Sequence, residues 1–371
     1  MSEKENLRPK AKQEISEEEK LKSIRLRAEM STCRFIHVLK NDKFCKPIVD
    51  FINRHFDPEE HFFIFLQIYA HSFDEFPLPE GDNVFYSEDP ACLAVSSLVS
   101  KVIFHGMYSN IIADHVRKHP EILEKAYWIP WGGDLYNPLI QPNKSLPYVQ
   151  ARVRGVAGNA RIIAEYKRRY GSEGKVFLPF NVTFESIPYA EILAQPIPQK
   201  DYVQILVNNS AHPSTLEVLR ALEKFKDENI RVATVLSYGA TQHNQEILEL
   251  GQSIFADKFF ALTEYVPPDE YLKFLAKNDI YIMNQERPQG MTTAFTAMLL
   301  GQKIFMREEC SGYLSDEGYT IYPTASLPDL SFAELCALDP ADAEKNRQLA
   351  DRRFNPKQVA EAWRNIFEYE P

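Results

Sequence analysis

The sequence is poor in glycine: only 14 of its 371 residues are glycine, about half of what the usual ~7% share would supply. No three glycines have the G-x-G-x-x-G spacing, and no glycine pair is followed by the lysine of a Walker A loop. The glycine-rich phosphate loops of dinucleotide- and NTP-binding proteins are therefore excluded. A phosphate site in this chain has to use helix N-termini and side chains instead.

Cysteine is also scarce, and the five cysteines are scattered without a C-x-x-C pair. This excludes a disulfide framework and a zinc ribbon, and it favours a reducing compartment. Asp-x-Asp is absent, and no His/Cys cluster has the spacing of metal ligands. We therefore expect a metal-independent mechanism with no cofactor and no metal site.

Long apolar runs are missing as well. The N-terminus lacks the apolar core of a signal peptide. The longest apolar stretch, 92–104, contains Lys101 and is too short to cross a bilayer. These features predict a cytoplasmic protein that is at most peripheral on the inner face of the cytoplasmic membrane.

The net charge is −10, and residues 186–371 hold 17 basic against 27 acidic residues. This excess argues against nucleic acid as a partner. The N-terminal half has one basic cluster, which is either a solvated helix face or a contact surface for anionic lipid headgroups or a pyrophosphate. The cluster consists of Arg152, Arg154, Arg161, Lys167, Arg168, Arg169 and Lys175.

What is present in abundance is an alternation of apolar strand-like runs with helical segments. Residues 1–30 are half charged, and we expect them to form an extension that is helical over 17–30, after the capping box that starts at Ser16, and partly disordered. Strands are expected at 34–39, 61–69, 83–86, 101–106, 125–131, 154–157 and 175–180. Helices are expected between them at 44–55, 90–99, 110–118 and 159–170. This pattern predicts a first parallel α/β domain over 31–185.

The alternation restarts after a proline-containing linker at 186–200. Strands are expected at 202–207, 231–237, 258–262, 279–283 and 303–306, with helices at 213–225, 242–255, 268–276 and 291–300. They predict a second domain over 201–350. The helix over 351–371, capped by Asn355 and Pro356, is expected to cross back to the first domain.

Two doubly wound Rossmann-like domains in series imply an α/β fold in which the carboxyl ends of both sheets face one cleft. This is the GT-B layout of many glycosyltransferases, and sugar-nucleotide 2-epimerases share it. One domain of such a protein holds a nucleotide, and the other holds an acceptor.

Three polar residues near strand ends of the first domain are candidate catalytic groups: His37, His105 and Asp134. A histidine that opens on the cleft suits a general base for an acceptor hydroxyl, and an aspartate suits the same role or orients the histidine. The acceptor-binding candidates are aromatic residues that can stack on a sugar, and glycines that allow close approach. They are Trp131, Gly132, Gly133 and Tyr136.

Three loops of the second domain carry the candidate donor site, and two of them lead into helices. Helix N-termini and hydroxyl donors suit a diphosphate, and Arg287 is the cation for the leaving group. The donor-binding candidates are Asn208, Asn209, Ser210, Tyr238, Gly239, Arg287, Gln289, Gly290, Thr292 and Thr293. For Asn, Ser and Thr, simple helix capping is the alternative.

Several of these loops match motifs of one family. The motifs are IHVLKND (36–42), FHGMYSN (104–110), WIPWGGDLYN (128–137), ILVNNSAHPS (205–214), SYGATQHN (237–244) and RPQGMTTAFTAMLLGQKIF (287–305). In these motifs the chain resembles the bacterial TDP-Fuc4NAc:lipid II Fuc4NAc transferases of glycosyltransferase family 56. The resemblance implies a GT-B fold, a dTDP-linked amino-deoxysugar donor, a polyprenyl-pyrophosphate-linked acceptor and no metal. Both an inverting reaction, with His105 or Asp134 as base, and a retaining reaction remain open.

Two alternatives belong to other classes. A GT-B 2-epimerase would need carboxylates and a histidine at the donor sugar, and Glu286 and His212 are available. An inactive GT-B scaffold would act through residues 1–30. Deleting that segment would distinguish the two readings. A scaffold would lose assembly, whereas an enzyme with an appendage would keep its transfer activity.

Overall fold

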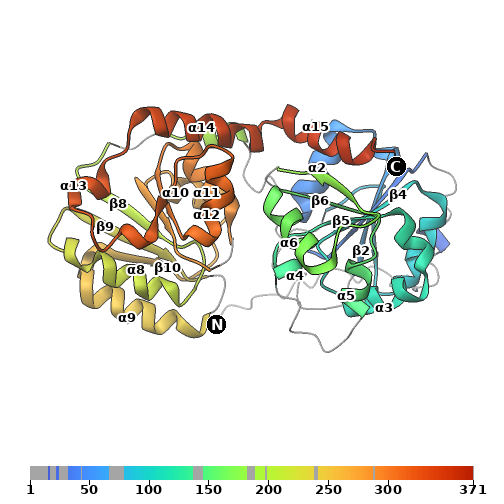
Figure 1. The fold of residues 1–371 in the computed structure, drawn as a ribbon, viewed down its shortest axis with the longest axis horizontal. Helices are drawn as coiled ribbons and strands as arrows, with labels where there is room; N and C mark the ends of the chain where they lie inside the picture. Colours follow the sequence, from blue (N-terminus) through green and yellow to red (C-terminus); the bar gives the residue numbers. More distant parts are fainter. Residues whose placement is uncertain are drawn as a thin grey trace, which may run out of the picture. The chain divides into compact units, whose positions relative to one another are not determined.

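The computed structural model describes residues 16, 22–24, 32–42, 44–66, 79–136, 145–181, 189–196, 199–237, 241–286 and 289–370 (Figure 1). The chain divides into two compact units. The first runs up to Ala157 and includes Glu165–Leu178, and the second comprises Gly158–Ala164 and Pro179–Glu370. The predicted first domain extends to residue 185, so the structure places its last residues with the second unit. Most of the predicted helix at 17–30 lies outside the described residues.

The first unit contains a seven-stranded sheet with the order β3-β2-β1-β4-β5-β6-β7. Its strands are β1 (Phe35–Leu39), β2 (His61–Leu66), β3 (Val84–Ser87), β4 (Lys101–His105), β5 (Ala126–Ile129), β6 (Gly155–Gly158) and β7 (Val176–Pro179). The pairs from β3 to β6 are parallel. Every residue of β1, β2 and β4 is buried, which explains why these strands read as continuous runs and not as alternating ones. The helices are α2 (Cys45–His55), α3 (Asn110–Lys118), α4 (Gly133–Tyr136), α5 (Ser145–Gln150) and α6 (Ala160–Tyr170).

Two predicted elements of this unit need correction. The segment predicted as a helix at 90–99 is a 3₁₀ helix at Pro90–Leu98, with Pro90 in its first turn. The strand predicted to reach residue 131 ends at Ile129, because Pro130 has no N–H to donate to a neighbouring strand. The early end of β5 leaves Trp131 in the loop before α4.

The second unit repeats the same winding in a six-stranded sheet with the order β10-β9-β8-β11-β12-β13, and its pairs are parallel. Its strands are β8 (Val203–Val207), β9 (Ile230–Val235), β10 (Phe259–Leu262), β11 (Ile280–Met283), β12 (Lys303–Met306) and β13 (Tyr322–Pro323). Both sheets therefore have a doubly wound strand order. The chain begins at a central strand, adds strands on one side of it, and then adds the remaining strands on the other side of that central strand.

Helices cover both faces of the second sheet. Figure 1 shows α8 and α9 on one face and α10, α11 and α12 on the other, and each face has its own apolar core. The helices are α7 (Tyr189–Leu193), α8 (Ser214–Leu222), α9 (Asn244–Phe255), α10 (Pro268–Leu275), α11 (Met291–Leu299), α12 (Glu308–Asp316), α13 (Phe332–Cys336), α14 (Pro340–Phe354) and α15 (Pro356–Phe367).

The predicted linker is not free of structure. It contains α7, whose Ile192 is 1% exposed and belongs to the core on the α11 side of the sheet. The predicted cap of α15 is confirmed, since Asn355 Oδ1 accepts a hydrogen bond from the backbone N–H of Lys357. On this helix Trp363 packs edge-on against Phe180, with 4.8 Å between ring centroids. The crossing of α15 to the first domain stays a prediction.

Candidate functional site

The carboxyl ends of β8 and β11 form the reversal point of the second sheet, where open α/β sheets bind their ligands. The two strands pair directly. β8 ends at Val207 and is followed by Asn208, Asn209 and Ser210, and β11 ends at Met283. Two of the three predicted donor loops, those after β8 and β11, therefore start side by side at one edge.

Asn208 is the anchor of this edge. It is fully buried and has a positive φ of 50°, a conformation that asparagine tolerates better than most residues. Its Oδ1 accepts a hydrogen bond from the backbone N–H of Asn284 at 2.8 Å, and its Nδ2 donates to Thr215 Oγ1 at 2.9 Å. Asn208 thus ties β8 to β11 and to the start of α8, and its side chain serves the protein itself.

The neighbouring residues lie against the start of α11. Asn209 Nδ2 is 3.4 Å from Thr293 Oγ1, and Gln285 Nε2 donates to Ser210 Oγ at 2.7 Å. Gly290 caps α11 with a φ of 62°, and a Cβ there would lie 1.4 Å from Asn209 Nδ2. Glycine is therefore required at 290 for Asn209 to reach the helix N-terminus. This part of the predicted donor set comes together around the N–H groups of α11.

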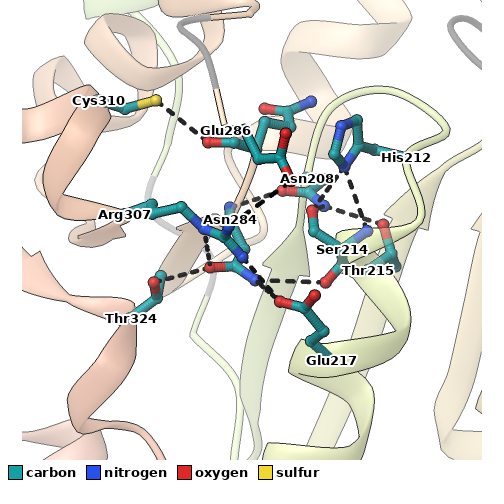
Figure 2. A network of polar contacts seen from close by, with 11 residues as sticks. Asn208, His212, Ser214, Thr215, Glu217, Asn284, Glu286, Arg307, Cys310 and Thr324 are labelled. Carbon is teal, nitrogen blue, oxygen red and sulfur yellow. Dashed lines mark hydrogen bonds and ion pairs between the residues drawn. The ribbon is translucent and has the colours of Figure 1, made fainter.

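Sequence reasoning missed a second polar network at this edge (Figure 2). Asn284 is buried after β11, and its Nδ2 donates to Glu217 Oε2 of α8 at 3.0 Å. Arg307, directly after β12, donates through Nη2 to the same oxygen at 2.7 Å. Thr324 Oγ1 donates to Asn284 Oδ1 at 2.8 Å. Arg307 therefore adds a cation to the carboxyl edge, joined through Asn284 to Asn208.

The remaining donor candidates divide into two groups. Gln289 and Thr292 lie at the start of α11 and are partly exposed. Tyr238, Gly239 and Arg287 lie outside the described residues, so their assignments stay predictions.

The two residues weighed for the epimerase alternative do not contact each other directly. His212 Nδ1 lies 2.7 Å from Ser214 Oγ and accepts from the Ser214 backbone N–H at 3.2 Å. The side chain of Glu286 is 78% exposed, and its carboxylate is 4.0 Å from Arg307. Figure 2 shows the two side chains on different sides of Asn208.

In the first unit, Asp134 is almost fully buried at the start of α4 and serves the loops around it. Its Oδ2 accepts hydrogen bonds from the Met107 backbone N–H and from Trp128 Nε1, both at 2.8 Å. Its Oδ1 accepts from the Trp131 backbone N–H at 2.9 Å. Burial raises the pKa of this carboxyl to about 6, although the three N–H donors act in the opposite direction. With both oxygens engaged, Asp134 holds the loop after β5 against the loop after β4.

The acceptor candidates surround this carboxylate. Trp131 and Tyr136 are partly exposed, and Trp131 packs edge-on against Phe44 with 5.9 Å between ring centroids. Gly132 has a φ of 98°, which only glycine adopts readily, and Gly133 begins α4. The loop can therefore present two aromatic rings at the carboxyl edge of the first sheet.

His37 and His105 lie in a chain of three buried histidines. His37 Nδ1 is 2.9 Å from His105 Nε2, and His37 Nε2 is 3.0 Å from His61 Nδ1. His105 is the last residue of β4, as predicted for a strand end. His37 lies in the middle of β1, so its predicted place at a strand end is wrong. Sequence reasoning missed His61, because only the strand register brings it to His37.

Burial determines the pKa values of these three histidines. It lowers the pKa of His61 and that of His105 to about 3 each. It also lowers the pKa of His37 well below its usual value, and its two histidine neighbours add to the effect. All three rings are therefore neutral near pH 7.

The basic cluster of the N-terminal half is only partly available to a ligand. Glu165 forms ion pairs with Arg168 and Arg169 on α6. Arg152 lies over the ring of Tyr148 at 3.8 Å, and the side chains of Arg152, Lys167 and Arg168 are exposed. Within the described part of the chain, no helix has the length and apolar character needed to span a bilayer. In the same residues, no group of three or more His, Cys, Asp or Glu side chains could hold a metal ion.

Comparison with known proteins agrees with this architecture. A family model described as "4-alpha-L-fucosyltransferase glycosyl transferase group 56" matches residues 35–308. A glycosyltransferase from Rickettsia africae is similar in structure, with a TM-score of 0.62 at 10% identity, covering 91% of this chain and 98% of that one. HepE of Anabaena, solved with UDP and glucose, has a TM-score of 0.61 at 12% identity, covering 90% and 99%.

The fold is not confined to transferases. A putative UDP-N-acetylglucosamine 2-epimerase from Listeria monocytogenes has a TM-score of 0.56 at 11% identity, covering 91% of this chain and 97% of that one. At such low identity the structural neighbours establish the GT-B fold. The family match is what separates transferase from epimerase.

Proposed function

The chain belongs to glycosyl transferase group 56, the 4-alpha-L-fucosyltransferase family, and from this premise we propose its substrates. The donor is a dTDP-linked acetamido-deoxyhexose such as Fuc4NAc. The acceptor is a polyprenyl-pyrophosphate-linked sugar or another surface glycan. The reaction proceeds without a metal ion.

The observation that carries the donor assignment is the contact of Asn209 with the start of α11 beside Ser210. The first N–H groups of a helix have no partners within it and carry a partial positive charge; in α11 the N–H of Thr293 already donates to the Gly290 carbonyl, so the available donors are those before it. A nucleoside diphosphate placed there accepts hydrogen bonds from these groups and from the Thr293 hydroxyl. Arg287 adds the cation that offsets the negative charge of the departing diphosphate.

On the acceptor side we assign His105 as the general base of an inverting reaction. The acceptor oxygen bonds to the anomeric carbon, the bond from that carbon to the diphosphate oxygen breaks, and the hydroxyl proton passes to His105. Asp134 is a poorer candidate, because three N–H groups occupy its oxygens. Trp131 and Tyr136 supply the rings on which the acceptor sugar stacks.

The acceptor lipid requires a membrane surface. The exposed basic side chains of Arg152, Lys167 and Arg168, with Arg154, Arg161 and Arg169 nearby in sequence, suit contact with anionic headgroups. This assignment places the enzyme peripherally on the inner face of the cytoplasmic membrane.

The test is a transfer assay that measures dTDP release from dTDP-Fuc4NAc in the presence of a lipid-linked acceptor and EDTA. Arg287→Ala should lower the rate by about 100-fold, the order of one leaving-group contact, without changing the melting temperature. Arg231→Ala is the matched control, because Arg231 is exposed near the amino end of β9, at the opposite edge of the sheet. Full activity of Arg287→Ala would remove Arg287 from the donor site, and no transfer by the wild type would remove the proposed substrates.

A further inference from the structure

Asn284 joins two parts of the carboxyl edge of the second sheet (Figure 2). Met283 pairs with Met306 in the parallel register, so Asn284 and Arg307 leave neighbouring strands side by side. The backbone N–H of Arg307 donates to the Met283 carbonyl at 3.2 Å. The side chain of Asn284 contacts the ion pair of Glu217 and Arg307, and its backbone continues into the loop that leads to α11.

The charges of this ion pair fix the orientation of the Asn284 amide. Asn284 is 5% exposed, its Nδ2 donates to Glu217 Oε2 at 3.0 Å, and its Oδ1 accepts from Arg307 Nε at 3.4 Å. A carboxylate can only accept hydrogen bonds, and a guanidinium can only donate them. The reversed amide would place its oxygen against the carboxylate and its N–H groups against the guanidinium. Only one orientation therefore satisfies both contacts.

The oriented Asn284 leads directly into residues of the proposed donor site. Its backbone N–H donates to Asn208 Oδ1 at 2.8 Å. The next residue, Gln285, is fully buried, and its Nε2 donates to Ser210 Oγ at 2.7 Å and lies 3.4 Å from Asn209 Oδ1. Because Asn284 and Gln285 share a planar peptide unit, a shift of Asn284 also moves Gln285 and the residues that Gln285 holds.

The ion pair itself is better suited to fixing this geometry than to stabilising the fold. Arg307 Nη2 lies 2.7 Å from Glu217 Oε2, and the two side chains are 26% and 62% exposed. Ion pairs this exposed stabilise a fold only slightly, because water and salt screen them. The same oxygen of Glu217 accepts from Arg307 and from Asn284, so Arg307 holds that oxygen where the Asn284 amide needs it.

We propose that Glu217 and Arg307 are positioning residues for the nucleotide-sugar donor. Their ion pair holds the Asn284 amide in one orientation, and Asn284 in turn holds the loop residues around the start of α11. The inference rests on the proposed donor site. Without the pair, the amide of Asn284 can turn and the loop loosens, so the donor binds more weakly. A carboxylate that acted on the donor only through its charge would have the opposite effect, because it repels a diphosphate and its removal would tighten binding.

Two substitutions at Glu217 separate positioning from charge, because both remove the same charge. Glu217→Leu removes both contacts of the carboxylate. It should raise the Kd of dTDP and the donor KM about tenfold, the order of one hydrogen bond, with kcat little changed because the pair touches no reacting atom. Glu217→Gln leaves an amide oxygen that accepts from Asn284 and should recover most of the lost affinity.

Arg307→Leu should weaken dTDP binding as Glu217→Leu does. The double variant should bind no more weakly than either single variant, because the two residues act as one unit. Lys273→Leu is the control and should bind dTDP as the wild type does, since it breaks an exposed ion pair with Asp269, 3.7 Å away on α10.

The measurements are calorimetric titration of the full chain with dTDP in EDTA and steady-state transfer, both well below the melting temperature of each variant. Tighter or unchanged dTDP binding by Glu217→Leu, or equal binding by Glu217→Leu and Glu217→Gln, would overturn the proposal. A wild type that binds no dTDP would overturn the donor site, and the proposal with it. If Arg307→Leu does not fold, the two variants at the exposed Glu217 still decide.

Discussion

The buried histidines make the first unit sensitive to acid. The pKa values of His61 and His105 are lowered by burial to about 3 in the folded protein, against an ordinary value of 6.5 for histidine. The free energy of unfolding therefore has its full value above pH 6.5 and decreases as the pH falls from 6.5 toward 3. The reason is that the unfolded chain binds protons at a higher pH than the folded chain. Between pH 7 and pH 5 each histidine removes about 2 kcal/mol from the free energy of unfolding, or about 4 kcal/mol for the pair.

Asp134 acts in the opposite direction. Its pKa is raised by burial to about 6, so the folded state takes up its proton first and gains about 1 kcal/mol between pH 7 and pH 5. The net loss is about 3 kcal/mol, to which His37 adds with the same sign as the other histidines. This is a large share of the ~5–15 kcal/mol that stabilises a typical domain.

Urea unfolding at pH 7, 6 and 5 measures this loss, followed by tryptophan fluorescence, to which Trp128 contributes from its buried position beside Asp134. His61→Leu should remove about 2 kcal/mol of the pH dependence. Equal unfolding free energies at pH 7 and pH 5 would refute the reasoning. So would a His61→Leu variant that loses stability with acid as steeply as the wild type.

Two further substitutions test the loops. Gly290→Ala places a methyl group 1.4 Å from Asn209 Nδ2 at a φ of 62°; it should weaken dTDP binding at least about tenfold and cost about 1 kcal/mol of stability, as measured by calorimetry and thermal melting. An unchanged affinity for dTDP would show that Asn209 does not belong to the donor site. Asp134→Asn replaces an acceptor that receives three N–H groups and should lower the free energy of unfolding by about 2 kcal/mol. A neutral result in urea titrations would mean that the loop does not depend on these hydrogen bonds.

The strands were predictable because a parallel sheet buries both faces, and each strand reads as an apolar run between helical segments. The order of strands and helices also predicts which loops lie at the carboxyl ends of the strands. Asn209, Ser210 and Thr293 were identified as candidates because they lie in or directly after such loops. Helix α7 was hidden by the prolines around it, and only the burial of Ile192 in the second unit reveals it.

Contacts between distant residues gave no local signal. Glu217 and Arg307 are 90 positions apart, and each alone looks like an ordinary surface charge. His61 opens β2 as one histidine among nine in the chain, and its contact with His37 depends on the register of two strands. Asp134 was recognised as important, but its position at a strand end suggested a base, whereas its three N–H donors show a structural role.

The most direct test of the donor assignment is a calorimetric titration of the full chain with dTDP, UDP, GDP and CMP in EDTA, repeated with Gly290→Ala. We predict that dTDP binds most tightly, that it does so without metal, and that Gly290→Ala weakens its binding. No binding of any of these nucleotides, or equal binding of dTDP by the wild type and the variant, would contradict a diphosphate site at the start of α11.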